Sequence, residues 1–473
     1  MKTPRHLAAR HGLWCGRLIL LALSLCARPG AAAAPDLDDL LRDLNALRRD
    51  HGVPGIALTL VSRDSVLWSG GIGYLDRDTR QPVTPDTPHR VEALSGTLVG
   101  LAVLLAAERG ELSLDDRVRA LVPDLPLENP WEHTHPVRIA HLLEHTAGLL
   151  DLSADGRSGA PDASGSLRCH WPPGLFPSWS RAGGRLAVAA LERSIDQPYA
   201  DFLERQLLAP LGMRETGLAD EVTPAGRPSP AYAADGTGPG MPSGAPGIVS
   251  TARELAALLR LLLNGGVGDS GRLLSRASIE RLETPLTPLG ARVGLAFGAG
   301  AGNLPAIHRG FLFHGQGGGA GAQLSHYAYS HRLGLGFVVI INAWEPAALE
   351  RLRTRLLDFL IGERRPHRPP RAEIDPQQLA RLSGRYQSLT WHSAAERPPP
   401  LQVLLNDGRL YTRGAGGAPQ ALVPVSTHLY RREEQPIATV AFVEYGGDVY
   451  LQGPFGNYRR AAGKPTDRGT AQR

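Results

Sequence analysis

Lysine is almost absent from this chain of 473 residues. Of its 51 lysine and arginine residues, only Lys2 and Lys464 are lysines, and none stands between those two positions. A mechanism that uses a lysine amine as base or nucleophile is therefore excluded for that whole stretch. Arginine is no substitute, because its guanidinium stays protonated in proteins.

Cysteine and metal-binding patterns are also scarce. Of three cysteines, Cys15 and Cys26 fall within the first 34 residues, which leaves Cys169 alone in the remainder. One thiol forms no internal disulfide and no four-cysteine zinc site, so we interpret Cys169 as a bystander. The sixteen histidines show no His-Glu-x-x-His spacing, and the close pair His133 and His135 is not interpreted as a metal site. We predict neither a metal nor a cofactor.

Long apolar runs and a basic surface are missing as well. No segment stays apolar for about 18 residues, so no transmembrane span is predicted. The net charge of +5 resides in residues 1–34, which hold five basic residues and no acidic one. The rest of the chain is neutral with histidine uncharged, so nucleic acid is not expected as a partner.

Residues 1–33 have the pattern of a signal peptide. A basic start is followed by the apolar run Leu18 to Ala27 and then by the small residues Ala31 to Ala34. That apolar run is too short to span a bilayer, which needs about 20 residues. We predict cleavage near Ala33 and export to the periplasm or the medium. A lipid anchor on Cys26 is disfavoured, because Leu25 stands where a small residue is expected.

Residues 34–361 mix helices and strands. We predict an opening helix over 37–49, a hairpin over 55–71, closing strands over 321–330 and 333–342, and a last helix over 347–360. Further helices are predicted over 97–108, 137–144, 184–195, 199–208 and 251–263. Strands at both ends of the region with helices between them predict an α+β fold.

The remaining residues predict a linker and an all-β domain. Residues 362–376 are rich in proline and arginine, which is typical of a linker. Residues 377–465 contain two clear hairpins, with the turns Asn406-Asp407-Gly408 and Gly446-Gly447. Short strands at this spacing predict a small β-barrel.

Several runs of residues resemble one known family. The runs are Arg90-Val91-Glu92-Ala93-Leu94-Ser95-Gly96-Thr97-Leu98, Glu144-His145-Thr146-Ala147-Gly148 and Gly247-Ile248-Val249-Ser250-Thr251-Ala252. They resemble the serine β-lactamases and penicillin-binding proteins, above all the class C branch with its esterases and D-aminopeptidases. The resemblance covers about residues 37–360. It implies an antiparallel sheet flanked by a helical subdomain, and the run Leu382-Ser383-Gly384-Arg385-Tyr386 is similar to the barrel that some members append.

The resemblance also implies where the first catalytic motif of the family, Ser-x-x-Lys, should lie. In that motif the serine attacks an acyl carbon and the lysine handles its proton. The serine position is Ala93 here and the lysine position is Gly96. Because no lysine exists in this region, no other alignment restores the motif.

The second and third motifs are substituted too. Tyr-x-Asn corresponds to Trp179 and Arg181, and neither of these side chains can accept a proton. Lys-Thr-Gly or His-x-Gly corresponds to the run from Gln316 to Gly318, in which only the glycine is kept. Losing one member of such a catalytic unit lowers the rate by up to about 10⁶-fold. We therefore predict a non-catalytic relative whose cleft is retained for binding or scaffolding, of cell-wall peptides or of a partner protein.

Two alternatives remain open. An active esterase or D-amino-acid peptidase could use Ser95 as nucleophile with His314, which lies two residues before Gln316 on one face of a strand. On a helix, however, Ser95 points about 200° away from Ala93, so it is interpreted as a helix-start residue that satisfies backbone groups. His314 and His145 are interpreted as structural, the latter bridging loops. The other alternative is that the barrel and the shell of the fold serve as an interaction module, or that the gene drifts under little constraint.

Overall fold

A computed structural model describes residues 36–150, 167–218, 232, 247–320, 322–390 and 398–461. The predicted signal peptide and the loops around 155–166 and 223–243 lie outside the described residues, apart from residue 232. No described helix has both the length and the apolar character needed to cross a bilayer.

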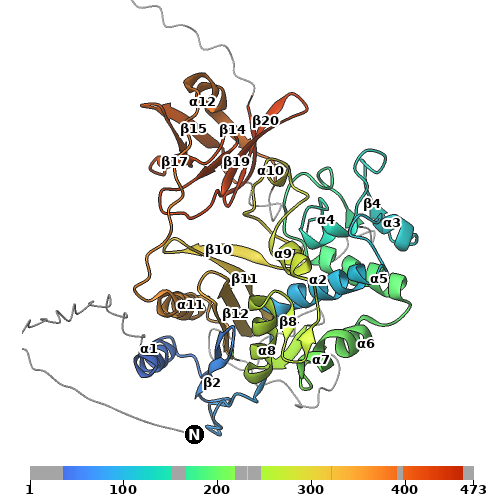
Figure 1. The fold of residues 1–473 in the computed structure, drawn as a ribbon, viewed down its shortest axis with the longest axis vertical. Coiled ribbons are helices and arrows are strands. Elements are labelled where there is room, and N and C mark those ends of the chain that lie inside the picture. Colours follow the sequence, from blue (N-terminus) through green and yellow to red (C-terminus); the bar gives the residue numbers. More distant parts are fainter. Residues whose placement is uncertain are drawn as a thin grey trace, which may run out of the picture. The chain divides into compact units, whose positions relative to one another are not determined.

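A six-stranded antiparallel sheet forms the centre of the first region (Figure 1). Its strands, in spatial order, are β10 (Leu304–His308), β11 (Phe311–Ala320), β12 (Gln323–Ser330), β13 (Leu335–Ile341), β1 (Gly55–Ser62) and β2 (Val66–Gly73). The pairing of β1 with β13 joins the start of the region to its end, as the sequence predicts. The fold is the predicted α+β arrangement.

Helices cover both faces of this sheet, because its central strands are apolar on both sides. In β1, Leu58 and Leu60 pack with the helices α1 (Leu37–Asp50) and α11 (Pro346–Ile361), whereas Ala57 and Val61 face the opposite core. That second core contains α2 (Glu92–Glu108), α8 (Ala252–Leu263) and α9 (Arg276–Glu283). Strand β11 contributes Phe311 and Phe313 to the core with α1 and α11.

The helical part packs beside α2. Its elements are α3 (Val118–Leu121), α4 (Ile139–Leu143), α5 (Arg181–Ile195), α6 (Tyr199–Leu203), a π-helical turn (Glu204–Leu208) and α7 (Ala209–Leu211). A short helix, α10, spans Leu289–Arg292. A small three-stranded sheet contains, in spatial order, β3 (Pro88–Arg90), β7 (Ile248–Thr251) and β6 (Gly217–Leu218). Two further strand pairs are β4 (Leu127–Glu128) with β5 (Leu167–Arg168), and β8 (Val267–Gly268) with β9 (Gly271–Arg272). The single helix predicted over 199–208 is thus wrong in detail, since the chain changes from α to π geometry there.

Helix α2 starts five residues earlier than predicted, at Glu92. Its N-cap, Val91, provides no side-chain hydrogen bond, so the sequence carries no start signal there. Thr97, the predicted first residue, is buried inside the helix and donates its hydroxyl to the Gly302 carbonyl at 2.8 Å. Tertiary contacts, rather than local capping, set the start of this helix.

The C-terminal region is a closed eight-stranded barrel preceded by α12 (Pro376–Leu382). Its strands are β14 (Gly384–Ser388), β15 (Leu401–Asn406), β16 (Arg409–Arg413), β17 (Gln420–Pro424), β18 (Leu429–Arg431), β19 (Val440–Tyr445), β20 (Asp448–Gly453) and β21 (Gly456–Arg460). The predicted hairpin turns are present, with positive φ at Asp407, Gly408, Gly446 and Gly447. Residues 364–375, within the predicted linker, form no helix or strand.

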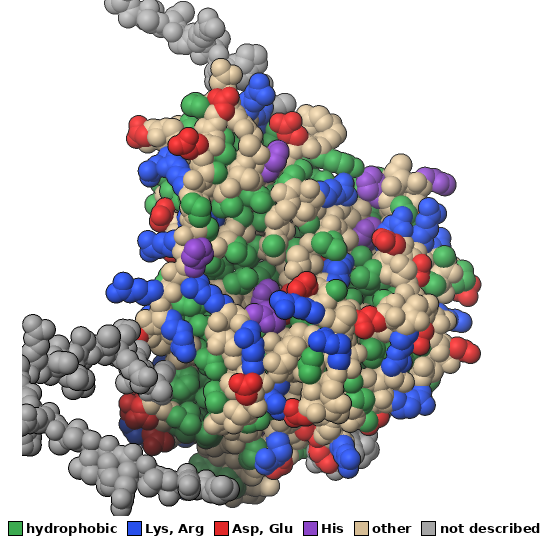
Figure 2. All heavy atoms as spheres, viewed as in Figure 1, with side chains coloured by type: hydrophobic (Ala, Val, Ile, Leu, Met, Phe, Trp, Pro, Cys, Tyr) green, Lys and Arg blue, Asp and Glu red, His purple; other side chains and the backbone are tan. Residues whose placement is uncertain are grey.

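Basic and acidic side chains are interspersed on the face shown in Figure 2, with no continuous area of one sign. This distribution agrees with the near-neutral charge of the chain beyond residue 34. It offers no basic stripe of the kind that follows a nucleic-acid backbone on that face.

Candidate functional site

The first and third substituted motifs meet in space. Ala93 and Gly96 lie in the first turns of α2, and Gly96 is exposed. A Cβ atom built on Gly96 would lie 3.7 Å from Oε1 of Gln316, on β11. The positions that the resemblance implies for the first and third motifs are therefore neighbours in the fold. The side chains of Ala93 and Gln316 do not take up a proton near neutral pH, and Gly96 has no side chain.

The register of β11 explains why Gln316 faces α2. Phe311 and Phe313 pack in the core with α1 and α11, so His314 and Gln316 point to the other side of the sheet. Gln316 pairs with Tyr327 on β12, which belongs to the core around α2. Strand alternation alone thus directs the third motif to the start of the helix.

The outer edge of β11 is open beside the site. Strand β10 pairs with β11 only from Phe311 to Gly315, so in the described part of the chain no strand continues along residues 316–320. On its other side β11 stays paired with β12 up to Ala320. The open stretch holds three glycines in succession, Gly317 to Gly319, which keep the edge free of side chains.

His145 holds the second motif in place. Its ring stacks on the indole of Trp179 with centroids 3.9 Å apart. The Ser178 amide donates to the His145 carbonyl at 2.7 Å, and the Ser180 amide donates to Nδ1 of its ring at 3.3 Å. This is the loop-bridging position that the sequence predicts for His145. Trp179 keeps 39% of its surface exposed, and Arg181 begins α5.

A buried ion pair supports the same corner. Glu144 is fully buried and pairs with Arg281 on α9. Its carboxylate also accepts from the Thr287 amide at 2.8 Å and from the Thr287 hydroxyl at 2.7 Å. The segment after α9 is thereby attached to the residue that directly precedes His145.

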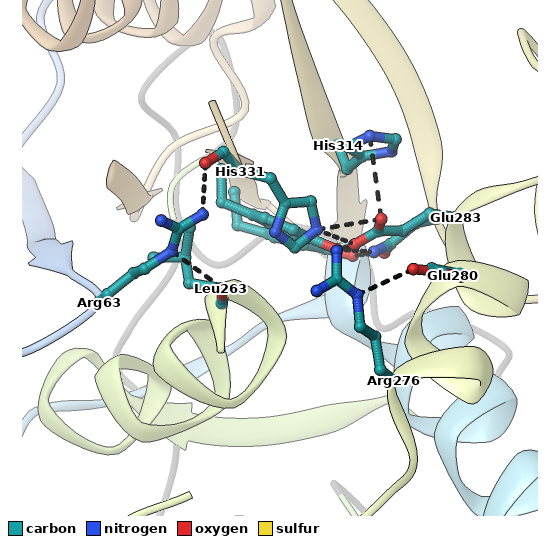
Figure 3. Close-up of polar contacts among 10 residues, drawn as sticks. Arg63, Leu263, Arg276, Glu280, Glu283, His314 and His331 are labelled. Carbon is teal, nitrogen blue, oxygen red and sulfur yellow. Dashed lines mark hydrogen bonds and ion pairs between the residues drawn. The ribbon is translucent and has the colours of Figure 1, made fainter. Parts of the chain in front are cut away.

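The two residual candidates for catalysis are not brought together. Ser95 Oγ is buried and has no hydrogen-bond partner among the described residues, so it satisfies no backbone group, contrary to the sequence-based interpretation. His314 points to Glu283 instead, with Nε2 and Oε2 separated by 3.9 Å, and its Nδ1 also lacks a partner among the described residues. Figure 3 shows His314 and His331 both directed at the Glu283 carboxylate. Among the described residues Ser95 and His314 make no hydrogen bond with each other, so they do not form a nucleophile–base pair.

Glu283 belongs to a chain of hydrogen bonds that sequence reasoning missed. This series of hydrogen bonds runs from α2 to the surface. In it, Asn303 donates to the Tyr329 hydroxyl at 2.6 Å, and the Tyr329 hydroxyl donates to the Glu283 carboxylate at 2.5 Å. In order, the linked side chains are Thr97, Tyr327, Asn303, Tyr329, Glu283 and His331. Only the alternating spacing of Tyr327 and Tyr329 on β12, continued by His331 in the turn that follows the strand, could have indicated a shared polar face.

Burial and hydrogen bonding act in opposite directions on Glu283. Burial alone would raise the pKa of its carboxyl, but the hydrogen bond from His331 and the nearby His314 outweigh it and lower that pKa. Burial lowers the pKa of His314, although the Glu283 charge opposes this effect.

Neither metal nor thiol chemistry is supported in the described residues. No group of three or more histidine, cysteine, aspartate or glutamate side chains there could hold a metal ion. His135 contacts the Thr134 hydroxyl and the Tyr445 hydroxyl. Burial raises the pKa of Cys169 to about 12, so its thiol is unreactive at neutral pH.

Comparison with known proteins agrees with the geometry. Penicillin-binding protein 4 from Amycolatopsis lactamdurans is 28% identical over 366 residues, which cover 72% of this chain and 95% of that protein. Esterase EstB from Burkholderia gladioli is 28% identical over 190 residues, covering 36% of this chain and 48% of the esterase.

Solved structures share the fold. The octameric penicillin-binding protein homologue from Pyrococcus abyssi superposes with a TM-score of 0.55 at 20% identity, covering 90% of this chain and 100% of that one. D-alanine carboxypeptidase AmpC from Burkholderia cenocepacia gives a TM-score of 0.53 at 22% identity, covering 70% and 100%. A family model described as Beta-lactamase matches residues 37–360, which is more than half of the sequence, and the chain therefore belongs to the Beta-lactamase family.

Proposed function

We propose that this protein is an exported family member that has lost the acyl-enzyme chemistry and keeps its site to bind cell-wall peptides. The observation that carries the proposal is the meeting of Gly96 with Gln316. The fold brings together the positions where the resemblance implies a lysine and a second basic residue, yet neither residue can move a proton. The nearness of these two positions, without a group that moves a proton at either of them, supports a site kept for binding.

The open edge of β11 supports peptides as the ligand class. An extended peptide can add to a free strand edge through main-chain hydrogen bonds, which need no catalytic side chain. The glycines at 317–319 let a second backbone approach closely. The exposed indole of Trp179 offers a flat apolar surface for a ligand side chain.

The names of related proteins suggest which peptides to test first. They include penicillin-binding protein 4 and, among structures that share the fold, a D-amino acid amidase and a D-alanine carboxypeptidase. Peptides that end in D-alanyl-D-alanine are therefore the first ligands to examine. Export rests on the pattern of residues 1–33, and it predicts a secreted chain whose first residue lies close to Ala34.

Intact mass spectrometry tests the loss of chemistry. The purified protein is incubated separately with a fluorophosphonate probe and with a penicillin, and we expect no mass change with either. A stoichiometric adduct would overturn the proposal, and peptide mapping would then identify the nucleophile. A label on Ser95 would establish the alternative of an active serine hydrolase.

Calorimetric titration with a D-alanyl-D-alanine stem peptide tests the binding. We expect saturable binding that Trp179→Ala weakens by about tenfold or more, because an aromatic side chain that becomes buried against a ligand contributes strongly to affinity. Leu405→Ala is the matched control, since Leu405 is an equally exposed apolar side chain on the barrel strand β15. Absence of binding, or equal effects of both substitutions, would contradict the assigned ligand.

A further inference from the structure

Two amide side chains of the barrel are buried where solvent exposure would be expected. Gln452 on β20 and Asn457 on β21 lie directly opposite each other in the strand register. Their neighbours Leu451 and Tyr458 fill the barrel interior, so alternation turns Gln452 and Asn457 to the outside of the barrel. Even so, Gln452 is only 3% exposed and Asn457 only 4%. Something outside the barrel covers them.

The covering residues belong to the segment that leads into the second motif. Gln452 Nε2 donates to the Leu175 carbonyl at 2.9 Å, and Asn457 Nδ2 donates to the Pro177 carbonyl at 2.8 Å. Trp179 follows two residues after Pro177. The barrel thus binds the backbone of the loop that carries the exposed indole of the site.

Gln452 also binds a second segment of the first region, the helix α10. Its Oε1 accepts from the amide of Gly290, in α10, at 2.5 Å. The Leu289 amide donates to the same Leu175 carbonyl at 3.1 Å. Because Thr287 donates to Glu144 just before α10, both segments that support His145 and Trp179 meet at one barrel side chain.

The hydrogen bonding of the amide pair is complete. Gln452 Nε2 also donates to Asn457 Oδ1 at 2.8 Å, and Asn457 Nδ2 also donates to the Thr390 hydroxyl at 2.8 Å. Every amide nitrogen and oxygen of the two side chains has a partner. A buried polar network that is fully satisfied fixes one arrangement, because any shift leaves a buried group unpaired.

Apolar contacts between the two regions accompany this network. Phe176 packs against Tyr450 on β20 with ring centroids 5.5 Å apart, and Trp171 donates its indole N–H to the Leu389 carbonyl at 2.7 Å. Side chains of both regions share one buried cluster, which includes Trp171, Leu175, Phe176, Leu289, Leu295, Ala438, Ala441 and Val443. Figure 1 shows α10 beside β20, at the junction of the two regions.

We infer that the C-terminal barrel is a positioning element of the site, and that Gln452 and Asn457 set the conformation of the loop carrying Trp179. The barrel acts through the backbone of residues 175–177. Its effect on ligand affinity rests on the function proposed above, whereas its effect on the loop does not.

Hydrogen–deuterium exchange of the full chain without ligand tests the inference. The variants are Gln452→Met and Asn457→Leu, which keep most of the side-chain volume and remove the hydrogen bonds. We expect peptides over residues 171–186 to exchange about tenfold faster or more, as the Gly174 and Ser178 amides lose their positions on Thr146 and His145. Peptides over β15 and β16 should be unchanged, which shows that the barrel remains folded.

Gln402→Met is the matched control. Gln402 is an exposed amide on β15 whose side chain contacts Arg413 within the barrel, so its loss should leave residues 171–186 unchanged. Unchanged exchange over 171–186 in both interface variants would overturn the inference. A purely structural role would speed exchange throughout the barrel to the same degree, and that result would overturn it too.

Titration of the same variants links the barrel to the ligand. We expect the affinity for the D-alanyl-D-alanine peptide to fall about tenfold in Gln452→Met and to stay unchanged in Gln402→Met. If the wild-type protein does not bind this peptide, the proposed ligand is wrong, and the exchange experiment alone decides the positioning role.

Discussion

The imidazole of His145 and the indole of Trp179 lie 3.9 Å apart, with an angle of 31° between their planes. His145 adopts a left-handed backbone conformation, with a φ of 54°. A residue other than glycine keeps this conformation at a cost of about 1–3 kcal/mol, so neighbouring contacts must hold it. The hydrogen bonds from Ser178 and Ser180 provide them. The position of the exposed Trp179 indole thus depends on His145, a residue with a strained backbone conformation.

A double-mutant cycle on His145→Ala and Trp179→Ala should reveal coupling between the two rings. We expect a coupling free energy of about 0.5–1.5 kcal/mol, the range for paired rings beyond their buried area. Urea unfolding of the two single variants, the double variant and the wild type measures it. Strictly additive effects would show that the stacking contributes nothing.

Two glycines of α2 should respond oppositely to alanine. Gly96→Ala should raise the free energy of unfolding by about 0.5–1 kcal/mol, because the added Cβ meets only Gln316 Oε1 at 3.7 Å and the helix loses a flexible residue. Gly100→Ala should lower it by about 1–3 kcal/mol, because its Cβ would lie 2.1 Å from the Ala301 carbonyl oxygen. Urea unfolding compares them, and a destabilised Gly96→Ala variant would contradict the open space seen beside Gln316.

Two arginines of α9 should differ strongly in their contribution to stability. Arg281→Met leaves the buried Glu144 without its counter-charge, and we expect a loss of about 3–5 kcal/mol in unfolding free energy. Arg276 pairs with Glu280 on the surface, so Arg276→Met should change stability by less than about 1 kcal/mol. Thermal and urea unfolding test both. Similar losses would mean that the Glu144 pair is no more important than a surface pair.

Acid should destabilise the protein through His141. Burial, with the charge of Arg138, lowers the pKa of His141 to about 4, and its Nδ1 accepts a hydrogen bond from the Arg138 amide at 3.2 Å. An unfolded histidine has a pKa of about 6.5, so the unfolded state binds the proton first as the pH falls. The stabilisation is therefore complete above about pH 6.5 and is lost progressively toward pH 4, by about 3 kcal/mol.

Unfolding free energies at pH 7 and pH 4.5 check this expectation. His141→Gln should reduce the difference between the two values by about 2–3 kcal/mol. The exposed His367 provides the control, and His367→Gln should leave the difference unchanged. An unaltered pH dependence in His141→Gln would assign the acid sensitivity to other groups.

Much of the fold was accessible from local patterns. Helix α1 begins at Leu37 as predicted, since the Asp36 carboxylate accepts from the Asp38 amide as an N-cap. The barrel hairpins follow from their turn residues. The start of α2 was missed because no capping residue marks it, and because Ser95 and Gly96 are weak helix formers.

Sequence reasoning could name residues of the candidate site only at the positions that correspond to motifs of the family. Gln316 and Gly96 were singled out from the sequence through their motif positions, and they are neighbours in the fold. The contacts of Glu283 with His314 and of Gln452 with Leu175 join residues far apart in the sequence. Gln452 even occupies an outward position on its strand, where alternation alone predicts a solvated side chain. Only the packing of the barrel against the first region makes it a buried residue.

The open edge of β11 also bears on how copies of this chain behave at high concentration. An unpaired strand edge is a template on which another molecule can add a strand and begin to aggregate. Glycine has a low strand propensity and no side chain to pack, so residues 317–319 form a weak template. An unpaired edge of this composition therefore favours self-assembly far less than a valine-rich edge would, while its backbone stays accessible.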